Sequence, residues 1–66
     1  MDRIVIDPNL HFGKPCIAGT RITVQDVLTL IAEGLSFAEI IRDCYPSLEV
    51  ADIQACLAYA IALMAC

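Results

Sequence analysis

Residues 23–39 read TVQDVLTLIAEGLSFAE, and this stretch decides the fold because it holds two helix starts on either side of one helix stop. Thr23 is a good N-cap residue, and the negative charge of Asp26 favours the first helical turn. Gly34 fits the left-handed residue that ends a helix. Ser36, with a glutamate three positions later, forms a capping box that opens a second helix. The stretch therefore predicts two consecutive helices joined by a short turn.

The helical pattern continues toward the C-terminus. The second helix is predicted to extend to about Cys44, because Pro46 then stops it. The third helix is predicted from about Val50 to the end of the chain. The residues at three- and four-residue steps that are expected to pack on the first two helices are Val50, Ile53, Leu57, Ile61 and Met64. A neighbouring face consists of Cys56, Tyr59, Leu63 and Cys66.

The third helix has no charged side chain beyond Gln54. A helix that is apolar on all sides is buried on all sides. In so small a domain, we therefore expect one side of this helix to contact another protein. The residues expected to form this partner contact or a dimer interface are Leu57, Tyr59, Ile61, Leu63 and Met64.

Short extended segments precede the helices. Residues 4–6 are a β-branched run that predicts a strand, and residues 16–18 predict a second one. Gly19 marks the turn that follows, and Gly19→Val is predicted to destabilise the domain if Gly19 takes a positive φ angle. Strands of this length are unstable alone, so they are expected to pair with each other or with a second copy of the chain.

A single domain, residues 1–66, is predicted. Its class is mostly α, with short strands and loops over residues 1–22 and a three-helix unit over residues 23–66. The helices are expected in a helix-turn-helix-like arrangement of the homeodomain or winged-helix type. A chain this small buries only about 60% of the surface that its unfolded form exposes, which favours a second subunit as a stabilising element.

The composition disfavours several classes of protein. The chain is 59% hydrophobic and 18% charged, with a net charge of −4. An acidic chain lacks the basic footprint that most nucleic-acid binders carry. The longest apolar run, residues 55–66, is shorter than the roughly 20 residues of a membrane-spanning helix. Without a signal-peptide pattern, a cytoplasmic location is expected.

No catalytic, metal or cofactor site is expected, and the protein is not expected to be an enzyme. His11, the one histidine, has no nearby serine and no cysteine at a zinc-ligand spacing. The four cysteines contain no C-x-x-C pair, so free thiols in a reducing compartment are expected. These cysteines are Cys16, Cys44, Cys56 and Cys66.

The sequence also resembles a widespread prokaryotic family. Residues 13–24 read GKPCIAGTRITV, and residues 34–36, 45–48 and 58–60 read GLS, YPSL and AYA. These blocks resemble the DUF433 family, a domain of unknown function described as antitoxin-like. The resemblance implies a helix-turn-helix-like domain with short N-terminal strands. It also implies a partner, because such proteins are often encoded beside a PIN-like ribonuclease and are taken to be its antitoxin.

Three functions follow as hypotheses. The leading one is an antitoxin that neutralises a PIN-like ribonuclease toxin through the third helix and acts as a candidate repressor of its own operon. The alternatives are a stand-alone dimeric DNA-binding regulator and a structural homo-oligomerisation module. A homodimer or higher homo-oligomer is expected, and steeply salt-dependent promoter binding would identify the DNA-binding regulator. The residues expected to face DNA are Lys14, Arg21, Arg42, Tyr45, Ser47 and Gln54.

Overall fold

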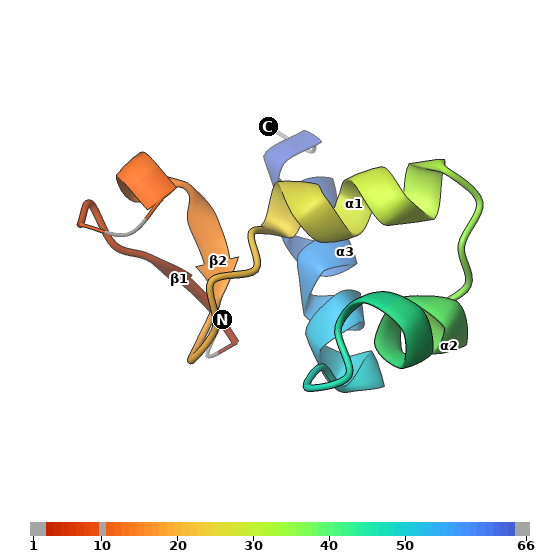
Figure 1. The fold of residues 1–66 in the computed structure, drawn as a ribbon. Coiled ribbons are helices and arrows are strands. Elements are labelled where there is room, and N and C mark those ends of the chain that lie inside the picture. Colours follow the sequence, from red (N-terminus) through yellow and green to blue (C-terminus); the bar gives the residue numbers. More distant parts are fainter. Residues whose placement is uncertain (1–2, 10, 65–66) are drawn as a thin grey trace.

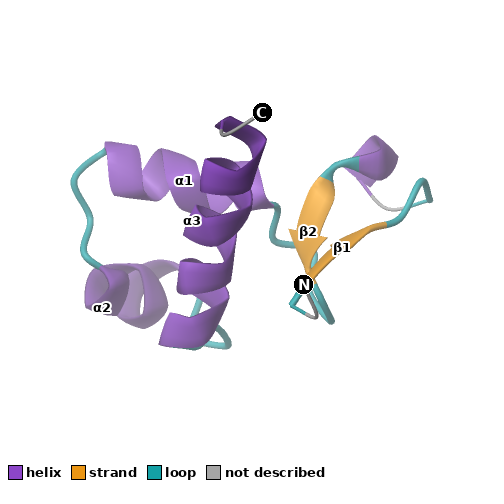
Figure 2. Ribbon diagram, turned by 180° about the vertical axis from the view of Figure 1, so that it is seen from behind, coloured by secondary structure: helices purple, strands orange, loops and turns teal. Residues whose placement is uncertain are grey.

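A computed structural model describes residues 3–9 and 11–64, and it confirms the predicted fold class: a short N-terminal β hairpin followed by three helices (Figure 1). The hairpin lies to one side of the helical unit, with α3 between it and α2 (Figures 1 and 2). The elements are β1 (Ile4–Ile6), the 3₁₀ turn η1 (His11–Gly13), β2 (Pro15–Ile17), α1 (Val24–Ala32), α2 (Phe37–Glu39), the π-helical turn η2 (Ile40–Cys44) and α3 (Val50–Met64).

The two strands pair antiparallel, with Ile4 opposite Ile17 and Val5 opposite Cys16. The second strand spans residues 15–17 and so begins one residue earlier than the predicted 16–18. An isolated bridge between Cys16 and Thr23 links the hairpin to the residue before α1. Ile4 and Ile17 point into the core, so the hairpin covers one side of the helical unit as well as pairing with itself.

The turn after β2 depends on Gly19. Its φ of +77° lies in the left-handed region. On either side of it, the Thr20 amide donates to the Ile17 carbonyl at 3.1 Å, and the Thr20 hydroxyl donates to the same oxygen at 2.8 Å. The Ile17 amide then donates to the Ile22 carbonyl, which closes the turn. This tight loop sets the direction in which the chain enters α1.

We expect Gly19→Val to destabilise the protein by about 1–2 kcal/mol, the cost of a left-handed residue with a Cβ atom. No atom lies within 4 Å of the position of a Cβ on Gly19, so the cost comes from the backbone and not from a clash. Urea unfolding followed by circular dichroism measures it. Gly19→Asn is the control, because Asn tolerates this conformation and should lose much less. Equal losses for both variants would contradict the assignment.

The helix ends follow the sequence signals. A complete capping box opens α1: the Asp26 amide donates to Thr23 Oγ1 at 3.0 Å, and the Thr23 amide donates to Asp26 Oδ2 at 3.2 Å. Ser36 and Glu39 repeat the arrangement before α2, and the Ser36 amide and hydroxyl lower the pKa of Glu39. At the end of α1, Gly34 adopts a φ of +98° and its amide donates to Ile31.

The second helix reaches Cys44 as predicted, but its second half is wider than an α-helix. The Tyr45 amide donates to the Ile40 carbonyl, five residues back, at 2.8 Å. This bond makes residues 40–44 a π-helical turn. Ile40 is fully buried in it, whereas Arg42 and Asp43 lie exposed on its outer side.

The core is a single cluster at the junction of the hairpin and the helices. Its central side chains have almost no exposed surface. Partly buried neighbours, among them Leu28, Tyr45 and Tyr59, surround it. The buried members are Ile4, Ile17, Val24, Val27, Ile40, Leu48, Ile53 and Cys56.

The predicted packing face of α3 is wrong except at Ile53. Val50, Ile61 and Met64, which were expected to pack on the first two helices, are 47%, 66% and 84% exposed. The neighbouring face packs instead: Cys56 is fully buried and Tyr59 is partly buried against the core. The hairpin explains the rotation, because β1 also packs against α3. Cys66, which was placed on this face, lies outside the described residues.

Candidate protein-binding surface

The five residues predicted as a contact set do not form one surface. Leu57, Ile61 and Met64 follow the buried Ile53 at helical steps along one flank of α3, and their exposure rises toward the C-terminal end of the helix. Tyr59 and Leu63 lie on the side that faces α1. The structure therefore separates one predicted surface into two, which we call the outer stripe (Val50, Leu57, Ile61 and Met64) and the α1–α3 groove.

The outer stripe runs the length of α3. Val50, Ile61 and Met64 are exposed, and Leu57 is half-buried. They occupy positions i, i+7, i+11 and i+14 of the helix, which is one flank, and the buried Ile53 at i+3 marks where this flank meets the core. No charged residue follows Asp52 among the described residues of α3, so nothing on this helix breaks the stripe with a charge.

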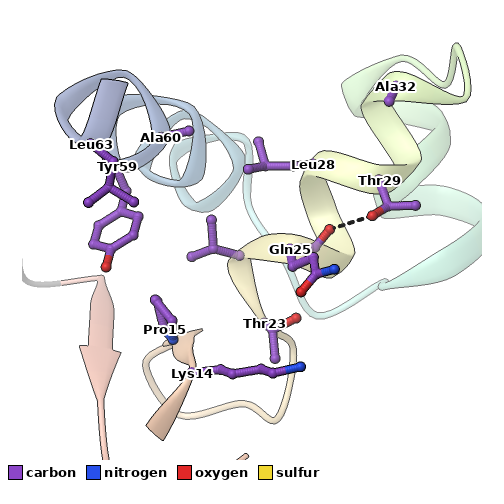
Figure 3. A pocket seen from close by; sticks show the side chains of 11 residues that line it. Lys14, Pro15, Thr23, Gln25, Leu28, Thr29, Ala32, Tyr59, Ala60 and Leu63 are labelled. Carbon is purple, nitrogen blue, oxygen red and sulfur yellow. Dashed lines mark hydrogen bonds between the residues drawn. The ribbon is translucent and has the colours of Figure 1, made fainter. Parts of the chain in front are cut away.

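The α1–α3 groove lies between α1 and the C-terminal half of α3 (Figure 3). Its volume is about 450 Å³. Leu28 forms the α1 wall, and Tyr59 and Leu63 form the α3 wall. Leu63 is 61% exposed although it is directed toward α1, because the last turns of α3 extend beyond the core. Lys14 and Pro15 border the groove at the hairpin.

An ion pair fixes the start of α3. Asp52 is 8% exposed, and its Oδ1 accepts a hydrogen bond from Arg3 Nη1 at 2.8 Å. Its Oδ2 accepts from the Glu49 amide at 2.9 Å, which satisfies a donor at the N-terminus of the helix. Burial alone would raise the pKa of Asp52, but the Glu49 amide and the Arg3 guanidinium outweigh it and lower this pKa. Sequence reasoning missed this pair, since 49 residues separate its members.

The six residues expected to face DNA lie at two ends of the molecule. Lys14 lies beside the C-terminal half of α3, where it borders the groove with Tyr59 and Leu63. Tyr45 and Ser47 belong to the turn before the N-terminus of the same helix, which is about 22 Å long at 1.5 Å per residue. Tyr45 is half-buried against the core. The exposed remainder is Arg21 in the β2–α1 loop, Arg42 in η2 and Gln54 in α3.

Carboxylates lie beside Arg42 and at the N-terminal end of α3. Arg42 Nε donates to Asp43 Oδ1 at 3.1 Å, and Nη2 donates to Oδ2 at 3.2 Å. The hydrogen bond from Arg42 lowers the pKa of Asp43. Glu49, directly before α3, is exposed and lies 3.6 Å from Arg3 Nη1. A phosphate approaching this end would meet carboxylates beside each guanidinium.

The described cysteines are free thiols. Cys16 and Cys56 are buried, and Cys44 is exposed. Burial raises the pKa of Cys56 to about 11, so this thiol stays protonated. The part of the chain that the structure describes holds no group of three metal-ligating side chains. It also holds no helix of the length and hydropathy needed to cross a membrane.

Phe12 is a surface feature that the sequence reasoning treated only as part of a loop. Its φ and ψ of 57° and 34° place it in the left-handed region, and it is 99% exposed. A bulky residue is uncommon in this conformation. The adjacent Gly13, with a φ of +81°, is the one sequence signal for an unusual turn at this position.

The comparisons with known proteins give one match. A family model described as "Protein of unknown function (DUF433)" matches residues 4–60. No curated protein and no solved structure matches the chain.

Proposed function

The chain belongs to the DUF433 family, whose function is unknown, and from this premise we propose that it is a non-enzymatic, antitoxin-like protein that covers a PIN-like ribonuclease with the outer stripe of α3. The observation that carries this proposal is the exposure of Val50, Ile61 and Met64 on one face of a 15-residue helix. Helices of this kind bind by placing an apolar face in a groove of the partner.

The charge of the chain supports the same class of partner. A ribonuclease must attract a polyanion, so its RNA-binding surface is basic. The chain carries eight acidic and four basic side chains. Negative charges around an apolar helix favour association with a basic surface and speed the encounter. The resemblance described above supplies the identity of the ribonuclease as PIN-like.

We expect Ile61→Asp to weaken binding to the ribonuclease by at least about 30-fold, the effect of losing one interface hot spot. A charge introduced into the centre of an apolar contact is desolvated without a partner. The measurement is RNA cleavage by a purified PIN-like ribonuclease from the same organism, with increasing amounts of the chain. Wild type is expected to stop cleavage at a fixed molar ratio.

Ala58→Asp is the matched control. Ala58 is exposed on the same helix, three residues before Ile61 but outside the outer stripe, so this variant should inhibit much more strongly than Ile61→Asp. If Ile61→Asp inhibits like wild type, the outer stripe is not the contact surface. If wild type neither binds nor inhibits the ribonuclease, the antitoxin proposal fails.

A stand-alone DNA-binding regulator is the second candidate. One observation favours it: Arg42, Ser47 and Gln54 are exposed around the turn that joins the second helix to α3. Binding to the promoter of its own gene, with an affinity that falls steeply as salt rises, would support it. Arg42→Ala should then reduce the salt dependence of binding by about one phosphate contact.

A further inference from the structure

Phe12 projects from the surface beside a groove that it does not fill. At 99% exposure its ring touches almost nothing in its own chain, although its left-handed backbone conformation costs free energy. A smaller hollow of about 300 Å³ lies between the ring and the N-terminus of α1. Lys14 and Thr23 line both this hollow and the α1–α3 groove, so the two lie next to each other.

The projection and the groove lie at the same end of the molecule. Figure 1 shows η1 level with α1 and with the C-terminal end of α3. A surface that carries a knob and an adjacent hole is complementary to a copy of itself turned by a two-fold rotation. We propose that two copies of the chain form a symmetric dimer, in which Phe12 of each copy enters the α1–α3 groove of the other.

The chemistry of the groove fits this occupant. Its walls are the apolar side chains of Leu28, Tyr59 and Leu63 (Figure 3). An aromatic ring packs against such walls, and Tyr59 offers a ring for an edge-to-face contact. The volume of about 450 Å³ exceeds that of one phenyl ring and leaves room for the flanking backbone of η1.

The rim of the hollow beside Phe12 carries one positive and one negative side chain. Lys14 and Asp26 both border the hollow beside Phe12, and both are exposed. Within the described residues, Lys14 takes part in no ion pair. A two-fold axis that places Phe12 in the opposite groove sets two rims, each carrying Lys14 and Asp26, against each other, so the interface holds charges of both signs. A partner of a different sequence would have to supply both charges separately.

The area is that of a small but specific interface. A fully exposed aromatic side chain contributes about 150–250 Å². Two Phe12 rings at about 200 Å² each, with equal areas of the two grooves that cover them, bury about 800 Å² in total. Contacts between the rims of the grooves add to this area. The total falls at the low end of specific complexes, below about 1,200 Å². The dimer is therefore expected to be concentration-dependent. It leaves the outer stripe of α3 free, so it stands independently of the proposed function.

Analytical ultracentrifugation of the full chain, over a range of concentrations, tests the dimer. Wild type is expected to reach twice the monomer mass of 7.2 kDa. Phe12→Asn and Leu63→Asp are expected to raise the dissociation constant at least tenfold. Asn keeps the left-handed conformation at position 12, so this variant folds without the ring. Ile61→Asp, on the outer stripe, should dimerise like wild type.

Fluorescence locates the contact. The chain contains no tryptophan, so Phe12→Trp introduces a single reporter. Its emission should shift to shorter wavelength as concentration rises, because the indole leaves water and enters the groove. The shift should disappear in the double variant Phe12→Trp with Leu63→Asp. Emission that stays at the solvent-exposed wavelength at every concentration would overturn the proposal.

The remaining outcomes are decisive as well. If Phe12→Asn remains dimeric with the wild-type dissociation constant, two copies associate elsewhere and the proposal is wrong. A wild-type chain that is monomeric throughout also overturns it, and the groove then belongs to a different partner. Since Ile61→Asp affects only ribonuclease binding and Phe12→Asn only the dimer, failure of one proposal can be distinguished from failure of the other.

Discussion

Ile53→Ala is expected to cost about 2–5 kcal/mol, the usual loss for truncating a buried isoleucine. Ile53 is fully buried in α3, within the cluster that joins the helices to the hairpin. A domain of this length has a total stability of roughly 3–10 kcal/mol, at 0.05–0.15 kcal/mol per residue. The loss is therefore a large fraction of the total stability, and the variant should unfold at a much lower urea concentration than wild type.

Urea unfolding of the variant measures this loss, and Ile61→Ala is its matched control. Both changes remove the same atoms from the same helix, but Ile61 is 66% exposed. A surface change of this kind is expected to alter stability by less than about 0.5 kcal/mol. Similar losses for the two variants would mean that α3 packs with both residues inward, as its sequence periodicity predicts.

Asp52→Ala is expected to destabilise the protein by about 2–4 kcal/mol, combining the loss of a helix cap with that of a charged hydrogen bond. The change leaves the Glu49 amide without its acceptor and Arg3 without its closest carboxylate. Urea unfolding at neutral pH gives the magnitude. Asp43→Ala is the control, because that carboxylate is exposed and its pair with Arg42 contributes little.

The pH dependence of stability provides a second measurement on Asp52. Its pKa is lower in the folded protein than the roughly 3.9 of an unperturbed Asp. The unfolded chain then binds more protons, so the contribution of Asp52 is complete above that ordinary value. It is lost as the pH falls through the lowered folded-state pKa. Asp52→Ala should remove part of the acid sensitivity of wild type, and an unchanged pH profile would contradict the ion pair.

The helix boundaries could be predicted because their signals are local. Thr23, Gly34 and Ser36 act on the backbone within four residues of themselves, and the structure uses each as the sequence indicates. The rotation of α3 could not be predicted in this way. Alanine and larger apolar residues surround the helix, so its periodicity does not distinguish the core face from the outer one. Contacts with the hairpin and with Arg3, far away in the chain, decide it.

The candidate binding surfaces could also be predicted only in part from the sequence. The absence of charge in the second half of α3 indicated an exposed apolar contact, and Ile61, Leu63 and Met64 are exposed. The division into an outer stripe and a groove depends on the position of α1, which the sequence of α3 does not contain. Phe12 was missed because its significance lies in one backbone angle and in an unfilled neighbouring groove.

The contact between the first strand and the last helix has a consequence for synthesis of the protein. Ile4 and Ile17 share a core with Ile53 and Cys56, and Arg3 pairs with a side chain 49 residues later. Before α3 leaves the ribosome, the hairpin can pack on α1 but lacks the side of the core that α3 supplies. The core of the nascent domain thus stays incomplete until α3 has been synthesised, and the domain then folds in one cooperative step.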